Sequence, residues 1–533
     1  MKIKMLLIAV AFITTGNAQD SLLRGWHLKD VKTSGYYGIS VDKAYQFLAE
    51  KKLESSPVIV AILDDGIDTS HEDLQKVFWV NKREIAGNGI DDDGNGYIDD
   101  VHGWNYLGNK DGRNVTSNSS EWIRVYWRYK AKYEGVKIDT TTLNEAQKYE
   151  YTMWQKARSG VVGKGMSKVE LQNLQEYLSN TLFSDSIFIS IFKGKEFTAK
   201  QLSKYKPISK MEEDIKAFYL EVFNQFTVPD VTNKFVLTEI ENYVNGEIRK
   251  ASGDKVPPED IRRLITGDDE KIETNKFYGN ADISNGALMH GTHLAGIIAA
   301  DRTNSIGMQG VANNVQIMMV RTSAEGDEHD KDIAMGIRYA VDNGAKVINM
   351  SFGKSLSPDK QMIDDAVKYA LAKDVLLVQA AGNSKRDIDG LDNFPNPVYL
   401  FKSATAPNWI TVAASDTIGN AAAFSNYGKQ VVNVFAPGVA IYSTVPGGNK
   451  YMSWEGTSMA APVVSGVAAL LRSYFPQLTA VTIKKIIEQT VSIPFTETTT
   501  PGSLKKVIMK QLCTSGGIIN AYNAVKLAFI YQQ

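Results

Sequence analysis

Short, mostly apolar runs recur along most of this 533-residue chain and alternate with helical patterns. The run at 58–63, Val-Ile-Val-Ala-Ile-Leu, contains no polar residue and is followed by Asp64, which is typical of a strand buried on both faces. Similar runs lie at 315–320, 347–350, 375–378 and 410–414. Because such strands need helices on both sides, the pattern predicts an α/β fold with a doubly wound, mostly parallel sheet.

The segments between several of these runs carry apolar stripes at helical spacing. One stripe covers 333–341 and is followed by Gly344, a residue type that commonly ends helices, and a second covers 362–370. Ligand sites of doubly wound sheets gather at the carboxyl ends of the strands. Asp64, Ser351 and Asn383 closely follow apolar runs, so we expect the functional site at this edge.

The stretch 107–276 has a different pattern of apolar residues. Its apolar residues form helical stripes at 171–182 and 215–226, and Ser167 with Glu170 has the spacing of a capping box before the first stripe. No apolar run of comparable strand-like clarity occurs there. We therefore predict a large, mostly helical insertion at 107–276 that divides the α/β domain into 19–106 and 277–533. Its aromatic residues lie on helical faces, where core packing is a commoner use than lining a substrate groove.

The first eighteen residues have the features of an export signal. Lys2 and Lys4 precede the apolar run 5–13, and small residues at 16–18 offer a cleavage site. The alternative, a membrane anchor, needs a longer apolar run, and no other stretch is long and apolar enough to span a bilayer. We predict a signal peptide at 1–18 and an exported protein, periplasmic or extracellular.

Charge and cysteine content argue against several classes of protein. The formal net charge is −1, so no overall basic field favours binding to nucleic acid or to an anionic membrane. Cys513 is the only cysteine, which excludes an intramolecular disulfide and a cysteine cluster for zinc. The sequence carries no signal of oligomeric state.

Three short segments carry the residue types of nucleophilic catalysis. They are Ala-Ile-Leu-Asp-Asp-Gly-Ile-Asp at 61–68, His-Gly-Thr-His-Leu-Ala-Gly at 290–296 and Gly-Thr-Ser-Met-Ala-Ala-Pro at 456–462. An Asp-Gly pair alone is usually a turn, but the three segments in this order resemble the Asp, His and Ser segments of the subtilisin-like serine proteases (peptidase family S8, the subtilases). The resemblance implies a serine endopeptidase that acts on protein or peptide substrates through an acyl-enzyme, with a catalytic triad of Asp64, His290 and Ser458.

Two further segments extend the resemblance. The segment 344–353, which ends in Met-Ser-Phe-Gly, resembles the family's substrate-pairing strand and implies that Ser351, Phe352 and Gly353 bind substrate. Ala-Ala-Gly-Asn at 380–383 resembles the oxyanion segment and implies that Asn383 stabilises the negative charge of the reacting carbonyl. The walls of the specificity pocket are expected from the loops after Ser351, Asn383 and Asp392.

Neighbouring residues of the same types are rivals for two of these roles. Asp65 and Asp68 compete with Asp64, and His293 competes with His290; the family pattern favours Asp64 and His290. Asp65 is also a departure, because the family usually has serine or threonine there, and a second carboxylate is expected to perturb the pKa of its neighbours. The long separation of Asp64 from His290 is another departure. The insertion accounts for it, so we expect the insertion near the rim of the active site.

The segment 91–100, Asp-Asp-Asp-Gly-Asn-Gly-Tyr-Ile-Asp-Asp, resembles a calcium-binding loop. Oxygen ligands at alternate positions and a sharp turn at Gly96 suit a hard cation, and five carboxylates this close repel one another unless a cation compensates them. His102 replaces the usual final glutamate, and the alternative is a solvated acidic turn. We predict structural calcium held by Asp91, Asp93, Asn95, the Tyr97 carbonyl, and Asp99 or Asp100. The family resemblance also implies Asp73 in a separate calcium site.

Two other functions are compatible with these motifs. A binding protein that has lost catalysis would not need to keep Asp64, His290, Asn383 and Ser458 together. A transpeptidase or cyclase would pass the acyl group to an amine, depending on how far water is excluded. About forty residues separate the predicted signal from the first strand, fewer than the folding pro-domain of many relatives, so we expect folding without one.

Overall fold

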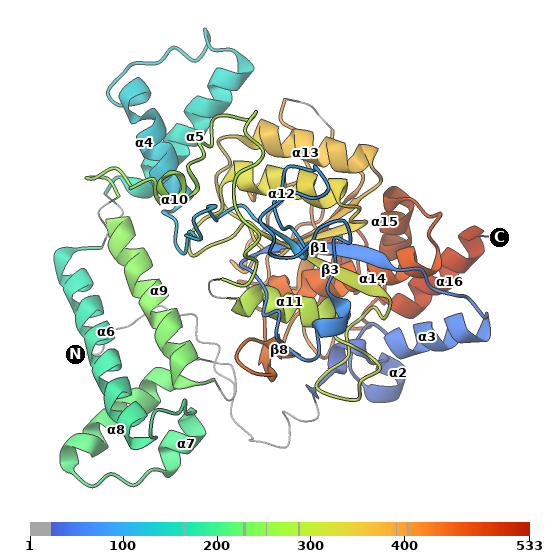
Figure 1. Ribbon diagram of the computed structural model, residues 1–533, viewed down its shortest axis with the longest axis horizontal. Helices are drawn as coiled ribbons and strands as arrows, with labels where there is room; N and C mark the ends of the chain where they lie inside the picture. The colour runs from blue at the N-terminus through green and yellow to red at the C-terminus, as the bar shows by residue number, and fades with distance from the viewer. Residues whose placement is uncertain are drawn as a thin grey trace. The chain divides into compact units, whose positions relative to one another are not determined.

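The computed structural model describes residues 23–163, 166–226, 231–251, 253–285, 288–390, 392–401 and 404–532 (Figure 1). The chain divides into two compact units. The larger unit comprises Leu23–Glu121, Lys137–Met153 and Glu259–Gln533, and the smaller includes Trp122–Val136 and Trp154–Pro258. The predicted signal peptide at 1–18 lies outside the described residues.

A seven-stranded sheet forms the centre of the larger unit, and each neighbouring pair of its strands is parallel. Five of the strands coincide with the apolar runs of the sequence, which confirms the predicted α/β class. The strand order is β2 (Gly103–Asn105), β3 (Val315–Arg321), β1 (Val58–Asp64), β4 (Val347–Met350), β5 (Leu376–Ala380), β6 (Trp409–Ser415) and β7 (Val434–Pro437).

Helices cover both faces of this sheet, as the predominantly apolar sequence of its central strands requires. Val60 and Ile62 of β1 belong to the core that includes α11 (Met289–Ala299) and α14 (Thr457–Tyr474). Ala61 and Leu63 point the other way, into the core of α12 (Asp330–Asp342) and α13 (Lys360–Ala372). Figure 1 shows these two pairs of helices on opposite sides of the strands.

The register of the sheet brings the carboxyl ends of β1, β4 and β5 together. Leu63 pairs with Met350, and Met350 pairs in turn with Gln379. The residues that follow these strands therefore share one edge of the sheet, where doubly wound folds bind their ligands.

The outer elements of the larger unit complete its core. Helix α3 (Val41–Glu50) packs against α16 (Ala521–Gln532), and the hairpin of β8 (Ile441–Val445) and β9 (Lys450–Trp454) contacts α11 through β8. Helix α15 (Ala480–Gln489) contacts α14 and α16. The shorter elements are η1 (Trp26–Leu28), α2 (Val31–Ser34), η2 (Gln75–Val77), α10 (Ile261–Thr266), β10 (Thr498–Thr499), β11 (Lys506–Val507) and η3 (Met509–Gln511).

A buried ion cluster fixes α10 against the start of α12. Arg262 donates to Asp332 at 2.6 and 2.8 Å and to Asp268 at 2.8 Å, and all three side chains are at most 2% exposed. Lys331 adds a second cation, 2.7 Å from Asp268. Because each buried charge here has an opposite partner, removal of one member leaves an uncompensated charge in the interior.

The smaller unit is helical in its described residues. It contains α6 (Lys168–Ile191), α7 (Ala199–Lys204), α8 (Lys210–Phe223) and α9 (Asn233–Ala251), with most of α4 (Glu121–Tyr133) and the end of α5 (Glu145–Val161). The capping box of Ser167 and Glu170 opens α6 as expected. Asp185 joins three helices, because Tyr219 Oη and Asn233 Nδ2 both donate to its Oδ1 at 2.7 Å.

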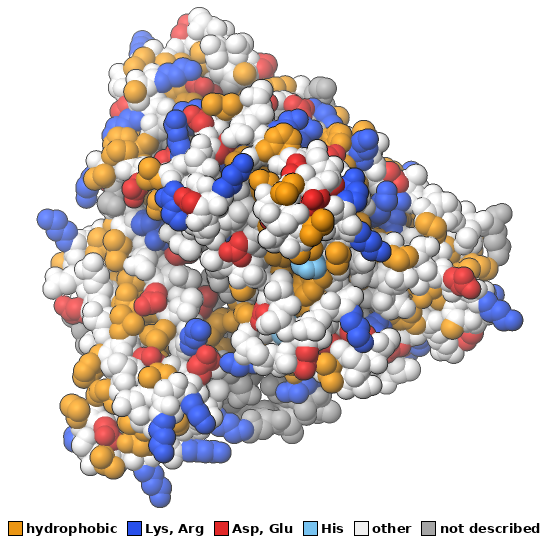
Figure 2. All heavy atoms as spheres, in the orientation of Figure 1, with side chains coloured by type: hydrophobic (Ala, Val, Ile, Leu, Met, Phe, Trp, Pro, Cys, Tyr) orange, Lys and Arg blue, Asp and Glu red, His pale blue; other side chains and the backbone are white. Residues whose placement is uncertain are grey.

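Among the described helices, none combines the length and the hydropathy that crossing a bilayer requires. Basic and acidic side chains are interspersed on the face that Figure 2 shows. This face therefore carries no continuous field of one sign.

Candidate active site

Asp64 and His290 form a hydrogen-bonded pair at the carboxyl edge of the sheet. Asp64 is the last residue of β1 and is 2% exposed, whereas His290 lies in the first turn of α11. His290 Nδ1 lies 2.7 Å from Asp64 Oδ1. Because an ionised carboxylate only accepts hydrogen bonds, Nδ1 carries the proton and Nε2 is left as the basic nitrogen.

Ser458 lies at the start of α14 and is bonded to the neighbouring strand end. Its Oγ donates to Ser351 O at 3.0 Å, and Ser351 Oγ donates back to Ser458 O at 2.9 Å. Within the described residues, the hydroxyl of Ser458 is thus directed to this carbonyl and not to the imidazole. Since β4 is the direct neighbour of β1, these bonds hold Ser458 at the same edge as Asp64 and His290.

Two N–H donors border one small space beside Ser458. Asn383 Oδ1 accepts from both Thr457 N and Thr457 Oγ1 at 2.9 Å, which fixes the orientation of the amide. A Cβ at Gly456 would lie 3.4 Å from Asn383 Nδ2 and 3.6 Å from Ser458 N. The glycine, whose φ of +155° also disfavours other residues, therefore leaves both donors accessible to an oxygen atom.

The segment Ser351–Gly353 continues outward from β4. Ser351 is buried, Phe352 is half-buried and Gly353 is exposed. The next residue is held firmly, because Lys354 and Phe394 exchange two backbone hydrogen bonds of 2.8 Å. The exposed Gly353 thus lies between the end of β4 and a residue fixed by two backbone hydrogen bonds. A strand that pairs with an extended peptide needs such a fixed backbone.

Asp65 has a structural role that the sequence did not predict. Its Oδ1 accepts from Gly291 N at 2.8 Å and its Oδ2 from His290 N at 3.4 Å. Leu288, at the N-cap of α11, supplies no capping side chain, so Asp65 caps the helix from a distant part of the chain. Burial, and then the nearby charge of Asp64, raise the pKa of Asp65 to about 7.

The two histidines of this segment have opposite electrostatic environments. Burial lowers the pKa of His290, but the charge and the hydrogen bond of Asp64 raise it, Asp65 and Glu328 add to the rise, and the resulting pKa is about 9. Burial lowers the pKa of His293 to about 3, and its Nε2 lies 3.1 Å from Met452 O. His293 is therefore neutral, and its Nε2 is bound to a backbone carbonyl. This leaves His290 as the histidine of the pair that can exchange a proton.

Trp454 covers both histidines and was not predicted. Its ring meets those of His290 and His293 edge-on, with centroids 5.9 and 5.8 Å apart. The residue ends strand β9, two positions before Gly456. It thus places a large apolar side chain next to the imidazole, where it limits access of water.

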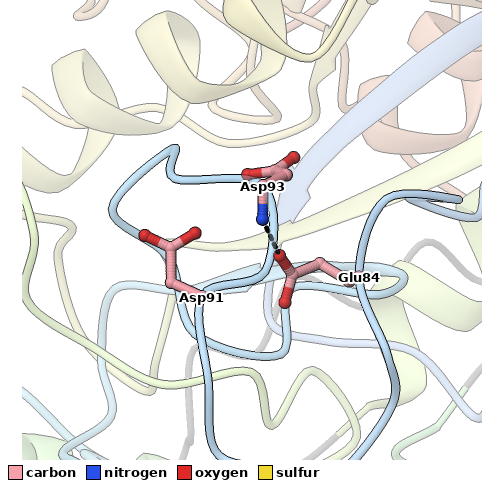
Figure 3. A group of neighbouring side chains, drawn as sticks. All are labelled: Glu84, Asp91 and Asp93. Carbon is pink, nitrogen blue, oxygen red and sulfur yellow. Dashed lines mark hydrogen bonds between the residues drawn. The ribbon is translucent and has the colours of Figure 1, made fainter.

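The acidic loop brings Glu84 together with two of the predicted ligands, Asp91 and Asp93. Oxygen atoms of Glu84, Asp91 and Asp93 all lie within 4.8 Å of one another. Figure 3 shows the three side chains and the 3.1 Å hydrogen bond from Asp93 N to Glu84 Oε1. Glu84 lies outside the predicted segment, although its carboxylate also accepts from Asp99 N at 3.0 Å. Three carboxylates in this arrangement suit a hard cation.

The other predicted ligands of this loop have protein partners. Asn95 lies beside the group, since its N donates to Asp91 and Asp93. Asp99 instead accepts from two backbone N–H groups at 3.0 and 3.1 Å, and Asp100 is buried and accepts from Asn81 and Tyr339. The ring of Tyr97 packs in an aromatic cluster with Trp104, Phe277 and Tyr339.

Asp73, which the family resemblance placed in a separate calcium site, accepts hydrogen bonds from Asn304, Met308 N and Tyr451.

The sequence of this chain is similar to those of known proteins. The sequence model of the subtilase family (Peptidase_S8) matches residues 55–512. Thermophilic serine proteinase of Bacillus sp. (strain AK1) is 39% identical over 249 residues, which are 46% of this chain and 54% of that protein. Thermitase of Thermoactinomyces vulgaris is 39% identical over 239 residues, which are 44% of this chain and 75% of thermitase.

The matches do not extend over the whole of every relative. The chain spans about half the length of the first curated relatives, 54% of the proteinase of strain AK1 and 52% of alkaline elastase YaB of Bacillus sp. (strain YaB). A solved protease of Pseudoalteromonas arctica PAMC 21717 is 31% identical, with a TM-score of 0.37, over 46% of this chain and 73% of that chain. Because the family match covers most of the sequence, the chain belongs to the subtilase family.

Proposed function

We propose that this protein is an exported serine endopeptidase that hydrolyses protein or peptide substrates through an acyl-enzyme. The observation that carries the proposal is the 2.7 Å pair of His290 and Asp64, next to the strand end that binds Ser458. Membership of the subtilase family supports the same chemistry. The signal-like residues 1–18 support export to the periplasm or the extracellular space.

In the proposed reaction, Ser458 Oγ turns from Ser351 O to His290 Nε2 and attacks the substrate carbonyl carbon. His290 takes the hydroxyl proton and then gives it to the leaving amine, so that the C–N bond breaks and the ester of Ser458 remains. Water, activated by the same nitrogen, then hydrolyses the ester. Asp64 holds the proton on Nδ1 and stabilises the imidazolium.

The oxyanion and the substrate backbone have separate partners in this proposal. Asn383 Nδ2 and Ser458 N donate to the carbonyl oxygen as it becomes negative, in the space that Gly456 leaves open. Ser351, Phe352 and Gly353 pair with the extended substrate backbone through main-chain groups. Recognition of backbone groups at this strand is independent of sequence, so selectivity must come from side-chain pockets.

We also propose a structural calcium ion at the acidic loop. Glu84, Asp91 and Asp93 would hold it, with Asn95 beside them, and the ion would supply positive charge that offsets their mutual repulsion. The loop lies between β1 and β2, and the hydrogen bonds of its three carboxylates go to other loop residues and not to the triad. Its expected effect is therefore on stability and not on the chemical step.

A serine-directed fluorophosphonate and a peptide library test the function together. Wild-type protein is expected to be labelled and to cleave peptides into products whose summed mass exceeds that of the substrate by one water. Ser458→Ala should do neither, although it should melt at the same temperature as wild type. Folded wild type that takes no label would instead indicate a binding protein. Products without added water would indicate transfer to an amine.

A further inference from the structure

A cavity of about 310 Å³ lies in the larger unit beside strands β5 and β6. Its size is that of a small ligand site. Most of its lining is aromatic or aliphatic and includes Tyr149, Phe394, Val398 and Phe401. Gln379 of β5 is one of the polar residues of the lining, together with Lys360, Asp392, Asn393, Asn396 and Thr411.

The cavity adjoins the two segments that flank Ser458. A Cβ at Gly353 would lie 3.6 Å from Asn393 Oδ1 and 3.9 Å from Gln379 Nε2, and both of these residues line the cavity. A Cβ at Gly382, the neighbour of Asn383, would lie 3.9 Å from the same Asn393 oxygen. Glycine at both positions therefore keeps side chains out of the region between the cavity and the substrate-binding segment.

Gln379 carries a hydrogen-bond donor that the described protein does not satisfy. The residue is 1% exposed, and its Nε2 has no hydrogen-bond partner in the described chain. Tyr399, which also lines the cavity, has an equally unpartnered hydroxyl. Buried polar groups are almost always paired in native proteins, so two unpaired groups in one cavity indicate that an occupant supplies their partners.

The charges near the cavity point to a neutral occupant. Lys360 Nζ is already bound by Asp364 Oδ1 and Val398 O, each at 2.5 Å. Asp392 is the only carboxylate of the described lining, and it is exposed to solvent. An ionised group inside the cavity would therefore lose its hydration without gaining a free counter-charge.

The cavity lies where the family resemblance places the specificity pocket, which takes the substrate side chain on the residue whose carbonyl is attacked. We propose that Gln379 makes this pocket select a large neutral side chain with a hydrogen-bonding tip. Tyrosine fits this description: the ring fills the apolar part, and the hydroxyl accepts from Gln379 Nε2. Phenylalanine has the same shape but leaves the amide unpaired, which a site built for a hydroxyl discriminates against. The inference rests on the proposed function, since it assigns the selectivity of that reaction.

Matched peptides that differ only in tyrosine or phenylalanine before the scissile bond test the inference. For wild type we expect kcat/KM to be about 3- to 10-fold higher for the tyrosine peptide, the range of one neutral hydrogen bond. Gln379→Met, which keeps the length but removes the amide, should abolish or invert this ratio. Gln361→Met, the same change at an exposed residue of α13 outside the cavity lining, should retain it.

Binding to Ser458→Ala separates this inference from the proposed function. The catalytically silent protein should bind the tyrosine peptide more tightly than the phenylalanine peptide, and adding Gln379→Met should remove the difference in Kd. This binding preference without hydrolysis by wild type would support the cavity and refute the peptidase. Hydrolysis with equal rates for both peptides, or a ratio unchanged in Gln379→Met, would overturn the cavity assignment alone. If Gln379→Met does not fold, Gln379→Asn, which withdraws the amide by one methylene, must weaken the preference.

Discussion

Replacing Asp65 with asparagine is expected to move the acidic limb of the pH dependence of kcat/KM to lower pH. His290 must be neutral at Nε2 to accept the serine proton, so kcat/KM rises as the pH rises through the pKa of His290. Burial lowers that pKa, whereas Asp64, Asp65 and Glu328 raise it, and the resulting pKa is about 9. Asparagine removes the charge of Asp65 but keeps an oxygen that can accept from Gly291 N.

The size of the shift follows from the order of these contributions. A nearby opposite charge moves a pKa by about 1–3 units, and Asp65 contributes less than Asp64, so we expect about one unit, or about 1.4 kcal/mol. Asp65 has a pKa of about 7, so its charge acts mainly above that pH. At pH 8 a fall in the pKa of His290 from about 9 to about 8 raises the neutral fraction from roughly one tenth to one half. The variant should therefore be about fivefold more active at pH 8.

The assay is a pH series of kcat/KM for one peptide at constant ionic strength. Asp65→Ser, which installs a residue usual in the family, should show the same shift if the charge is the cause. Asp68→Asn is the matched control, because Asp68 lies in the same turn but bonds to Ser70 and Gly447. An acidic limb for Asp65→Asn that coincides with wild type, or moves to higher pH, would refute the reasoning.

Three further outcomes are expected. Asn383→Ala should lower kcat by about 10²- to 10³-fold with little change in KM, because it removes a donor needed only in the transition state; an unchanged kcat in a steady-state assay would exclude this donor. Arg262→Met should lower the free energy of unfolding by about 3–5 kcal/mol in urea titrations, since it leaves Asp332 buried without the cation that binds it, whereas Asp268 keeps Lys331; a loss below 1 kcal/mol would contradict this. Chelation should lower the melting temperature of wild type and have a smaller effect on Glu84→Gln; equal shifts would argue against a cation at Glu84.

Local sequence was sufficient to predict the central strands, because short, mostly apolar runs have few alternatives to burial in a parallel sheet. The edge strands β2 and β7 were not predicted. Strand β2 is only three residues long, Gly103–Asn105, and it owes its conformation to pairing with β3. Strand β7 (Val434–Pro437) is similarly short and ends in a proline. The conformation of such short segments depends on pairing with strands that are distant in sequence. The local hydrophobic pattern carries no information about that pairing.

The site was predicted through motifs, and its supporting residues were missed for a common reason. Asp65 caps a helix that begins far along the chain, and Glu84 joins two aspartates only after the loop has folded. Neither role leaves a local pattern. Gln379 did leave a local pattern, because it is the single polar residue in the strand Leu-Leu-Val-Gln-Ala. A buried amide at such a position requires a hydrogen-bond partner.

The first turn of α12 anchors the chain at two distant points. Lys354 Nζ lies 2.7 Å from both Asp330 and Glu121, at the point where the chain leaves the larger unit. Asp332 holds Arg262 shortly after the chain has returned. Between these anchors, Lys137–Met153 still belongs to the larger unit, and its Tyr149 donates to Ser357 O. The polypeptide of 154–258 can therefore change in length or sequence without pulling on β1 or α11. Tolerance of a long excursion between an aspartate and its histidine thus depends on a few interior ion pairs, and segments grafted in place of 154–258 should leave the pair in register.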